Sequence, residues 1–195
     1  MRFCRTLVTG GALLGTLALI PSEALAQTTA VYGQSVAEPR TVTVTPFVGV
    51  SFGTSNDLGS SLGIGAAVGY DWTRNLGFEV ELGHVFDVVG DDDNLDWSLT
   101  NISANVIYHF DVPRLTPYAT AGLGWERSTP KYDLVDPAQQ TIGRSTEVAW
   151  NFGGGVKVPV GDRLLARGDL RRFQVNDFAP DHWRLYGGLT FWIKR

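Results

Sequence analysis

The sequence lacks several features that would point to the more common protein classes. It contains a single cysteine, Cys4, so no disulfide can form within the chain. Beyond residue 26 no apolar run approaches the roughly 18 residues typical of a transmembrane helix, and no convincing helix pattern appears. The formal net charge of −4 gives no basic excess of the kind that nucleic acid selects. These absences argue against a disulfide scaffold, a helical membrane protein and a nucleic-acid-binding protein.

The first 26 residues have the pattern of a secretory signal peptide. Arg2 and Arg5 form a basic start, residues 7–20 an apolar middle, and Ala24-Leu25-Ala26 a small-x-small cleavage site. We therefore expect export through the Sec pathway. The mature chain would begin with a flexible lead-in over residues 27–40, which are polar and show no clear period.

Cleavage would also change the charge and remove the cysteine. Loss of Arg2, Arg5 and Glu23 turns 16 basic and 20 acidic residues into 14 and 19, a formal charge of −5. Cys4 precedes the apolar segment instead of standing at the cleavage point, which excludes a lipoprotein. An exported domain without disulfides must be held together by its own packing or by a membrane.

The mature chain is rich in period-two alternation, the signature of β-strands. In the closing stretch, Leu185, Leu189 and Phe191 share one face, and Arg184 and Thr190 lie on the other. Eight such segments are predicted, over residues 41–53, 61–72, 76–88, 98–110, 117–126, 146–158, 164–173 and 183–195. Short connections at 73–75, 111–115 and 160–163 alternate with longer loops at 54–60, 89–96, 127–145 and 174–181. The pattern predicts an all-β fold, an eight-stranded antiparallel up-and-down transmembrane β-barrel over residues 41–195.

Glycine and charge decide which face of the strands is inside. Glycines such as Gly63, Gly65, Gly122 and Gly124 share the polar face, where a cramped interior would favour them. A basic residue facing lipid near the midplane would cost about 2–4 kcal/mol, so the polar face must be the lumen. The charged side chains predicted to form a lumen network are Glu79, Glu81, Lys157, Arg167, Asp169, Arg171 and Arg184. Arg172 falls on the lipid side, so we place it near a rim.

Aromatic residues gather towards the strand ends, as they do at membrane interfaces. The predicted interface aromatics are Tyr70, Trp72, Phe78, Tyr108, Phe110, Trp125, Trp150 and Trp183. Ordinary core aromatics are the alternative interpretation.

Several segments together resemble the small outer-membrane β-barrel proteins of Gram-negative bacteria, the porin-family group that includes OmpX, the transmembrane half of OmpA and Opa-type surface proteins. They are Gly69-Tyr70-Asp71-Trp72, Gly77-Phe78-Glu79-Val80-Glu81, Thr116-Pro117-Tyr118, Ala121-Gly122-Leu123-Gly124 and the closing strand. The resemblance implies a monomer in contact with outer-membrane lipid and lipopolysaccharide. It also implies delivery by periplasmic chaperones and recognition by the barrel-assembly machinery, with Leu189, Phe191 and Trp192 as the assembly signal.

No motif predicts chemistry. The acidic run Asp92-x-Asn94-x-Asp96 resembles the start of a calcium loop, but Trp97 replaces the required glycine and Ser103 the required glutamate. There is no Gly-x-Ser-x-Gly elbow and no histidine in a His-x-Ser arrangement. We expect no catalytic, cofactor-binding or metal-binding residue.

The expected function is therefore that of a non-enzymatic outer-membrane barrel, acting in envelope structure or in surface interaction through its extracellular loops. Two alternatives stay open: a narrow passive pore, which would make the charged lumen residues a constriction, and a soluble periplasmic carrier of the lipocalin kind. The first predicts discrete conductance, and the second predicts extraction by salt washing.

Overall fold

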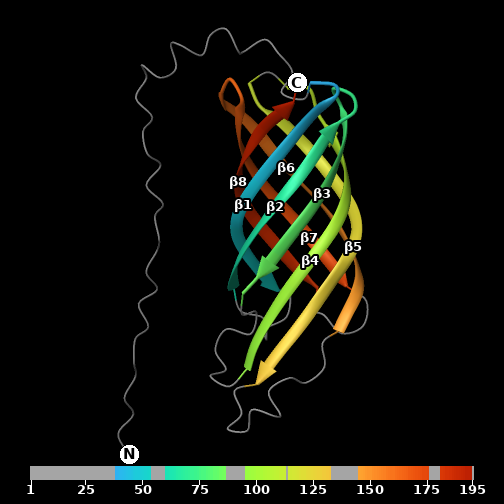
Figure 1. Ribbon diagram of the computed structural model, residues 1–195, viewed down its shortest axis with the longest axis vertical. Coiled ribbons are helices and arrows are strands. Elements are labelled where there is room, and N and C mark those ends of the chain that lie inside the picture. The colour runs from blue at the N-terminus through green and yellow to red at the C-terminus, as the bar shows by residue number, and fades with distance from the viewer. Residues whose placement is uncertain are drawn as a thin grey trace, which may run out of the picture. The chain divides into compact units, whose positions relative to one another are not determined.

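The computed structural model describes residues 38–53, 60–86, 95–112, 114–132, 145–175 and 181–194. These residues form one closed antiparallel β-barrel in which each strand pairs with the next and the last pairs with the first (Figure 1). No helix in this part of the chain is long and apolar enough to cross a bilayer. The predicted fold class, an eight-stranded antiparallel barrel, is confirmed.

Eight strands make up the wall. They are β1 (Thr41–Gly53), β2 (Ser60–Asp71), β3 (Leu76–Val85), β4 (Leu95–His109), β5 (Thr116–Tyr132), β6 (Ser145–Gly161), β7 (Leu164–Val175) and β8 (His182–Lys194). The connections β2–β3, β4–β5 and β6–β7 are at the same end of the barrel as the start of β1 and the end of β8 (Figure 1). The other four connections are at the opposite end.

The seam between β1 and β8 closes the sheet. Phe52 pairs with Trp183 near one end of this seam and Val42 with Lys194 near the other, with a register shift between Val42 and Thr43. A second shift lies between Pro159 and Gly161 at the end of β6. Both irregularities are at strand ends, where one unpaired residue disturbs the ladder least.

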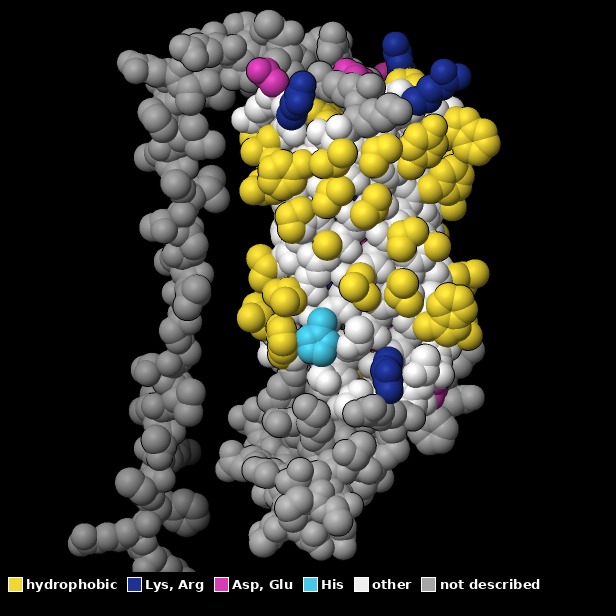
Figure 2. All heavy atoms as spheres, viewed as in Figure 1, with side chains coloured by type: hydrophobic (Ala, Val, Ile, Leu, Met, Phe, Trp, Pro, Cys, Tyr) yellow, Lys and Arg dark blue, Asp and Glu magenta, His cyan; other side chains and the backbone are white. Residues whose placement is uncertain are grey.

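The faces of the strands follow the predicted direction. Leu62 and Val80 are 55% and 53% exposed on the outer wall, whereas Glu79 and Arg167 are each 4% exposed in the interior. Hydrophobic side chains cover much of the visible wall, and charged side chains lie towards its two ends (Figure 2). The assignment of apolar side chains to the outside and polar ones to the lumen is confirmed.

The predicted strand ends need correction, most of all in the β4–β5 hairpin. The expected loop 127–145 is wrong in its first part, because β5 continues to Tyr132 and pairs with a β4 that begins at Leu95. Alternation also continues, with Arg127 exposed and Ser128 buried. Pro130 suggested a loop, but proline is tolerated in a strand where its nitrogen has no donor role. β6 and β7 likewise run past their predicted ends, to Gly161 and Val175, whereas β3 stops earlier, at Val85.

Candidate functional site

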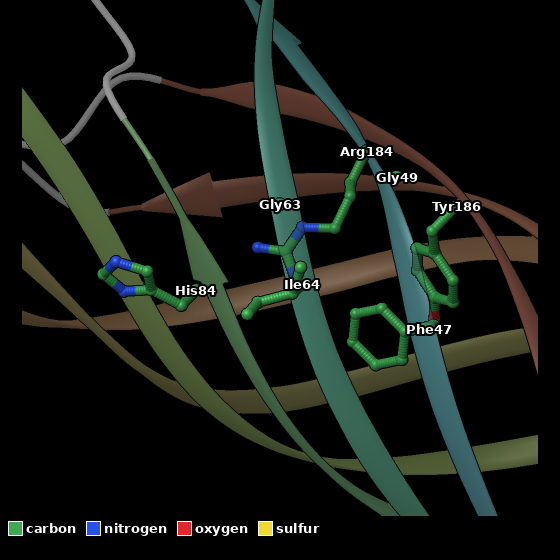
Figure 3. Close-up of a pocket in the computed structure, with 7 residues that line it drawn as sticks. All are labelled: Phe47, Gly49, Gly63, Ile64, His84, Arg184 and Tyr186. Carbon is green, nitrogen blue, oxygen red and sulfur yellow. The ribbon is translucent and has the colours of Figure 1, made fainter.

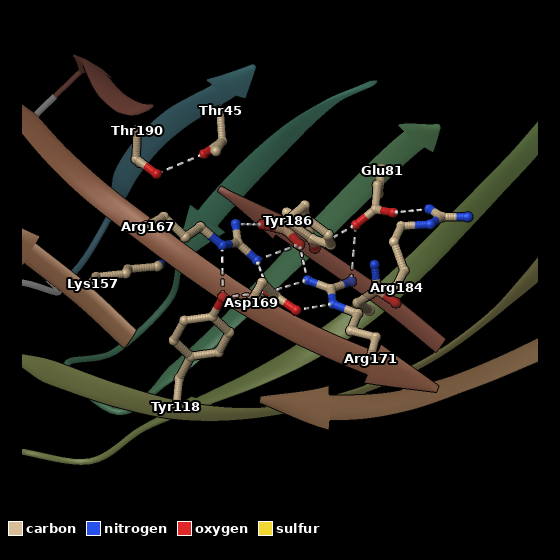
Figure 4. A network of polar contacts seen from close by, with 12 residues as sticks. Thr45, Glu81, Tyr118, Lys157, Arg167, Asp169, Arg171, Arg184, Tyr186 and Thr190 are labelled. Atoms are coloured by element: carbon tan, nitrogen blue, oxygen red, sulfur yellow. Dashed lines mark hydrogen bonds and ion pairs between the residues drawn. The ribbon is translucent and has the colours of Figure 1, made fainter. Parts of the chain in front are cut away.

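The lumen contains a layer of ion pairs that crosses the barrel from β3 to β7 and β8. The seven charged residues predicted for the lumen all point inward and are at most 5% exposed. Figure 4 shows most of this network, with Tyr118 and Tyr186 joining the charged groups. Strand alternation places each of them inside, because their positions have the parity of the buried face of their strands.

Arg167 on β7 forms the centre of the first cluster. Its guanidinium donates to both carboxylate oxygens of Glu79, at 2.5 and 3.1 Å, and to Asp169 at 2.9 Å. Its Nε donates to the hydroxyl of Tyr118 at 2.7 Å, and that hydroxyl in turn donates to Asp169. The bidentate contact with Glu79 is the geometry in which arginine pairs most strongly with a carboxylate.

Arg171, two residues further along β7, links this cluster to a second one. It contacts Glu79 at 2.9 Å, Glu81 at 3.0 Å and Asp169 at 3.0 Å. Glu81 also accepts hydrogen bonds from Arg184 at 3.1 Å and from the Tyr186 hydroxyl at 3.0 Å. Three carboxylates and three guanidinium groups therefore form one connected and electrically neutral set.

Lys157 lies in a separate group near the end of the barrel that carries the short connections. Its Nζ is 2.9 Å from Nε2 of His109, and the His109 Nδ1 is 3.9 Å from Asp71. Lys157 also lies 5.5 Å from the centre of the Tyr118 ring. Tyr118 thus stands between the lysine group and the arginine network.

A further polar group occupies the lumen on the side of the longer connections. Nε2 of His182 is 3.7 Å from Oε2 of Glu126, and both side chains are fully buried. The His182 ring stacks on Phe173 with centroids 5.1 Å apart, and the Arg184 guanidinium lies 4.2 Å from the Phe173 ring centre.

The lumen glycines make room for these side chains. A Cβ at Gly83 would lie 2.8 Å from Nη1 of Arg184 and 2.5 Å from Oδ1 of Asn101. A Cβ at Gly155 would collide with the Tyr118 hydroxyl and with a backbone oxygen of β7. The clustering of glycine on the inward face is therefore a requirement of packing.

One narrow hollow lies beside the arginine network. Its lining comprises Phe47, Gly49, Gly63, Ile64, His84, Arg184 and Tyr186, and it has no room for a water molecule (Figure 3). The Phe47 ring stacks on Tyr186 with centroids 4.4 Å apart and fills the space that Gly65 leaves, while Tyr186 lies against Gly49. This part of the lumen is packed.

Most of the remaining predicted residues lie on the outer wall or at its ends, and Trp192 does not. Of the predicted interface aromatics, all but Trp183 are well exposed; Trp183 is half-buried, with the guanidinium of Arg172 5.5 Å from its ring centre. Arg172 pairs with Asp181 at 3.0 Å, three residues before the end of β7. In the predicted assembly signal, Leu189 and Phe191 face outward, whereas Trp192 is buried in the lumen beside Leu165.

The interpretation from sequence named the charges but omitted several lumen partners. Alternation places Tyr118, Tyr186 and His109 on the polar face, and Glu126 shares the parity of Gly122 and Gly124 on β5, but the predicted network includes none of the four. The Asp92–Asp96 pattern cannot be assessed, because residues 87–94 and the side chain of Asp96 lie outside the described residues. Among the described residues, no group of three or more histidine, cysteine, aspartate or glutamate side chains could hold a metal ion.

Comparison with known proteins places this barrel among outer-membrane proteins. The profile of the family described as outer membrane protein beta-barrel domain matches residues 12–191. No curated protein matches the chain in sequence.

Solved structures share the fold at low sequence identity. The Neisserial surface protein A has a TM-score of 0.62 and 21% identity, over 77% of this chain and 96% of that one. The N-terminal barrel of Pseudomonas aeruginosa OprF has a TM-score of 0.56 and 23% identity, over 78% and 97% of the two chains. Ail, the attachment invasion locus protein of Yersinia pestis, has a TM-score of 0.55 and 11% identity, over 78% and 99%.

Proposed function

Since the chain belongs to the outer membrane protein β-barrel family, we propose that it is a sealed, non-enzymatic barrel that acts at the cell surface through its longer loops. The barrel serves as a membrane anchor, and the loops supply the contacts. In this proposal the lumen has neither a transport role nor a catalytic role.

The observation that carries this proposal is the ion-pair layer across the lumen. Arg167 and Arg171 reach from β7 to Glu79 on β3, on the far side of an eight-stranded barrel, and Arg171 also reaches Glu81. A barrel of eight strands has an interior just wide enough for side chains to fill. The guanidinium and carboxylate groups of this layer hold one another in place across the lumen, and in this proposal they block the passage of ions.

The loops are assigned to the outside by their placement. Connections β1–β2, β3–β4, β5–β6 and β7–β8 start and finish at one end of the barrel. The short connections are at the opposite end, together with the start of β1 and the end of β8. In outer-membrane barrels the short turns face the periplasm and the longer loops face outward. The segments 54–59 and 133–144 are therefore exposed to the medium in this proposal.

The family neighbours include proteins named for surface roles. Ail is called an attachment invasion locus protein and has been crystallised with the heparin analogue sucrose octasulfate. These names support a surface role for the present chain as a class of function, without indicating which molecule its loops contact.

Conductance across a planar bilayer separates the sealed barrel from a narrow pore. The purified wild-type barrel is expected to give no discrete channel steps. The same conductance measurement is made on Arg171→Ala, which removes the side chain shared by three carboxylates. Regular single-channel steps from the wild-type barrel would overturn the proposal of a sealed barrel and show that the protein is a pore.

Orientation is tested by epitope insertion on intact cells of a Gram-negative host. A tag placed between residues 133 and 144 should be stained by antibody without permeabilisation, and a tag between Asp162 and Arg163 should not. Staining of the second tag alone would reverse the orientation and remove the surface role.

The same proposal covers export and assembly. Residues 1–26 would be removed as a signal peptide after Sec export, residues 27–40 would form the lead-in, and residues 41–195 the barrel. Mass spectrometry of the mature protein should give a chain that starts at Gln27. The assembly machinery would recognise the closing residues Leu189, Phe191 and Trp192, so Phe191→Ala should slow assembly of the barrel in cells. The folded barrel would remain a monomer in contact with lipid and lipopolysaccharide.

A further inference from the structure

Among the buried residues that the structure describes, the lumen charges do not cancel unless one more positive charge is present. Glu79, Glu81 and Asp169 are matched by Arg167, Arg171 and Arg184. Asp71 and Lys157, on either side of His109, are also of opposite sign. Of the fully buried carboxylates in the described residues, Glu126 forms no ion pair with an arginine or lysine: the charge of Arg184 acts on it, but Arg184 is already paired with Glu81.

Glu126 is poorly placed to remain an isolated anion. It is 1% exposed, and neither of its carboxylate oxygens accepts a hydrogen bond within the described part of the protein. An ionised carboxylate removed from water without a partner is strongly destabilising, and proteins avoid it by binding a cation or a proton. The group facing it is His182, whose Nε2 is 3.7 Å from Oε2 of Glu126.

We propose that Glu126 and His182 form a buried binding site for one proton at the outer end of the lumen. The proton is either on the carboxyl group of Glu126, which leaves both side chains uncharged, or on the imidazole of His182, which gives an ion pair of imidazolium and carboxylate. In either form the positive charge that the lumen lacks is supplied.

The surrounding strands favour this site. Glu147 on β6 pairs directly with Glu126, is half-buried and accepts a hydrogen bond from Ser145, so a second carboxylate adds negative potential. Glu81 on β3 forms ion pairs with both Arg171 on β7 and Arg184 on β8. The facing residues of β4, β1 and β2 are the uncharged Asn101, Ser51 and Ser61. The described neighbours thus place a second carboxylate, that of Glu147, beside Glu126 on the adjacent strand.

His109 provides a contrast within the same lumen. It is also buried and has a carboxylate, Asp71, 3.9 Å from its Nδ1. However, Nζ of Lys157 lies 2.9 Å from its Nε2, and an ammonium group can only donate. The Nε2 atom of His109 must therefore be a bare acceptor, and this ring is neutral.

The site also couples the outer end of the barrel to pH. His182 begins β8 directly after Asp181, whose carboxylate accepts hydrogen bonds from Arg172, Gln174 and the Val175 amide at the end of β7. A folded barrel that keeps a proton at neutral pH, where a free histidine has released it, binds more protons than the unfolded chain. The contribution of this site to stability is then full at mildly acidic pH, where a free histidine is also protonated, and falls as the pH rises through neutrality.

Nitrogen NMR of histidine-labelled barrel in detergent micelles at pH 7.5 reads the ring states directly. His182 is expected as an imidazolium, with both ring nitrogens protonated, and His109 as a neutral ring protonated at Nδ1. If His182 is neutral, the proton must be on Glu126, and infrared spectra should show a protonated carboxyl band that Glu126→Gln removes. A neutral His182 together with an ionised Glu126 would overturn the proposal.

A second measurement follows the unfolding midpoint between pH 6 and pH 8.5. Wild-type barrel should lose stability as the pH rises, and Glu126→Gln should flatten that slope because a neutral amide needs no proton. Glu147→Gln, which alters only the neighbouring half-buried carboxylate, should keep most of the slope. An unchanged slope in Glu126→Gln, or in His182→Asn should the glutamine variant fail to fold, contradicts the site.

Discussion

Arg171 contacts three carboxylates at once, those of Glu79, Glu81 and Asp169. A buried charge of this kind is stabilising only while its partners remain, since the cost of removing it from water has already been incurred. At the scale of single residues, the lumen is therefore sensitive to loss of one member and tolerant of changes at its exposed rim.

Glu79→Gln tests that sensitivity. The change leaves Arg167 and Arg171 short of the carboxylate they share, and the free energy of unfolding should fall by about 3–5 kcal/mol. Guanidinium unfolding in phospholipid vesicles, followed by tryptophan fluorescence, measures it. The control is Asp181→Asn in the part-exposed pair with Arg172, where the loss should stay below about 1 kcal/mol. Equal losses would show that burial does not govern these pairs.

Two glycines test the packing argument with one chemical change. A Cβ at Gly124 would collide with the Ile102 carbonyl and lie 2.6 Å from the Ser103 Cα, whereas a Cβ at Gly168 would have nothing within 4 Å. Gly124→Ala should therefore lower the unfolding midpoint or prevent folding. Gly168→Ala should be neutral or stabilise by up to about 1 kcal/mol, as alanine generally does over glycine inside a strand. Similar behaviour of the two variants would refute a steric role for the lumen glycines.

At the scale of the strand, the environment of an outward-facing residue depends on its depth in the bilayer as well as on the face of the strand that carries it. Val80 lies in the middle of β3 and Val160 one residue before the end of β6, and both are more than half exposed. The midplane of a bilayer is far less tolerant of charge than its interfaces.

Arginine scanning at these two valines measures the position of the hydrocarbon. Val80→Arg should destabilise the barrel in phospholipid vesicles by about 2–4 kcal/mol, and Val160→Arg by about 0–1 kcal/mol. Matching costs at the two positions would mean that β3 and β6 are displaced relative to the membrane from the arrangement inferred here.

Strand faces could be predicted from the sequence, but the partners across the lumen could not. Alternation places Glu79 and Arg167 inside because it depends only on the parity of each residue. That Arg167 meets Glu79 depends on how far each strand is staggered around the barrel, which no local pattern encodes. Strand ends were also missed, because Arg127 and Pro130 look like loop residues to a rule that ignores pairing with β4.

For the molecule as a whole, closure determines behaviour under denaturing conditions. Every strand has a neighbour on both sides, so no edge is available from which detergent could separate the sheet gradually. Unboiled protein in SDS should therefore migrate as a compact species, and boiled protein at the position of its unfolded chain. A gel of paired samples checks this, and identical mobility would contradict a closed membrane barrel and favour the lipocalin-like alternative.

The β1–β8 seam also has a consequence for the timing of biogenesis. Val44 at the beginning of the chain's sheet bonds to Phe191 at its end, so the first strand waits for the last to be delivered. A chain with only seven strands in the membrane would have two edge strands whose backbone amides and carbonyls lack hydrogen-bond partners. Such unpaired backbone groups are strongly unfavourable in the hydrocarbon of a bilayer. Maturation must accordingly be a single late event, and a ribosome that stalls before residue 182 yields a product fit only for proteolysis.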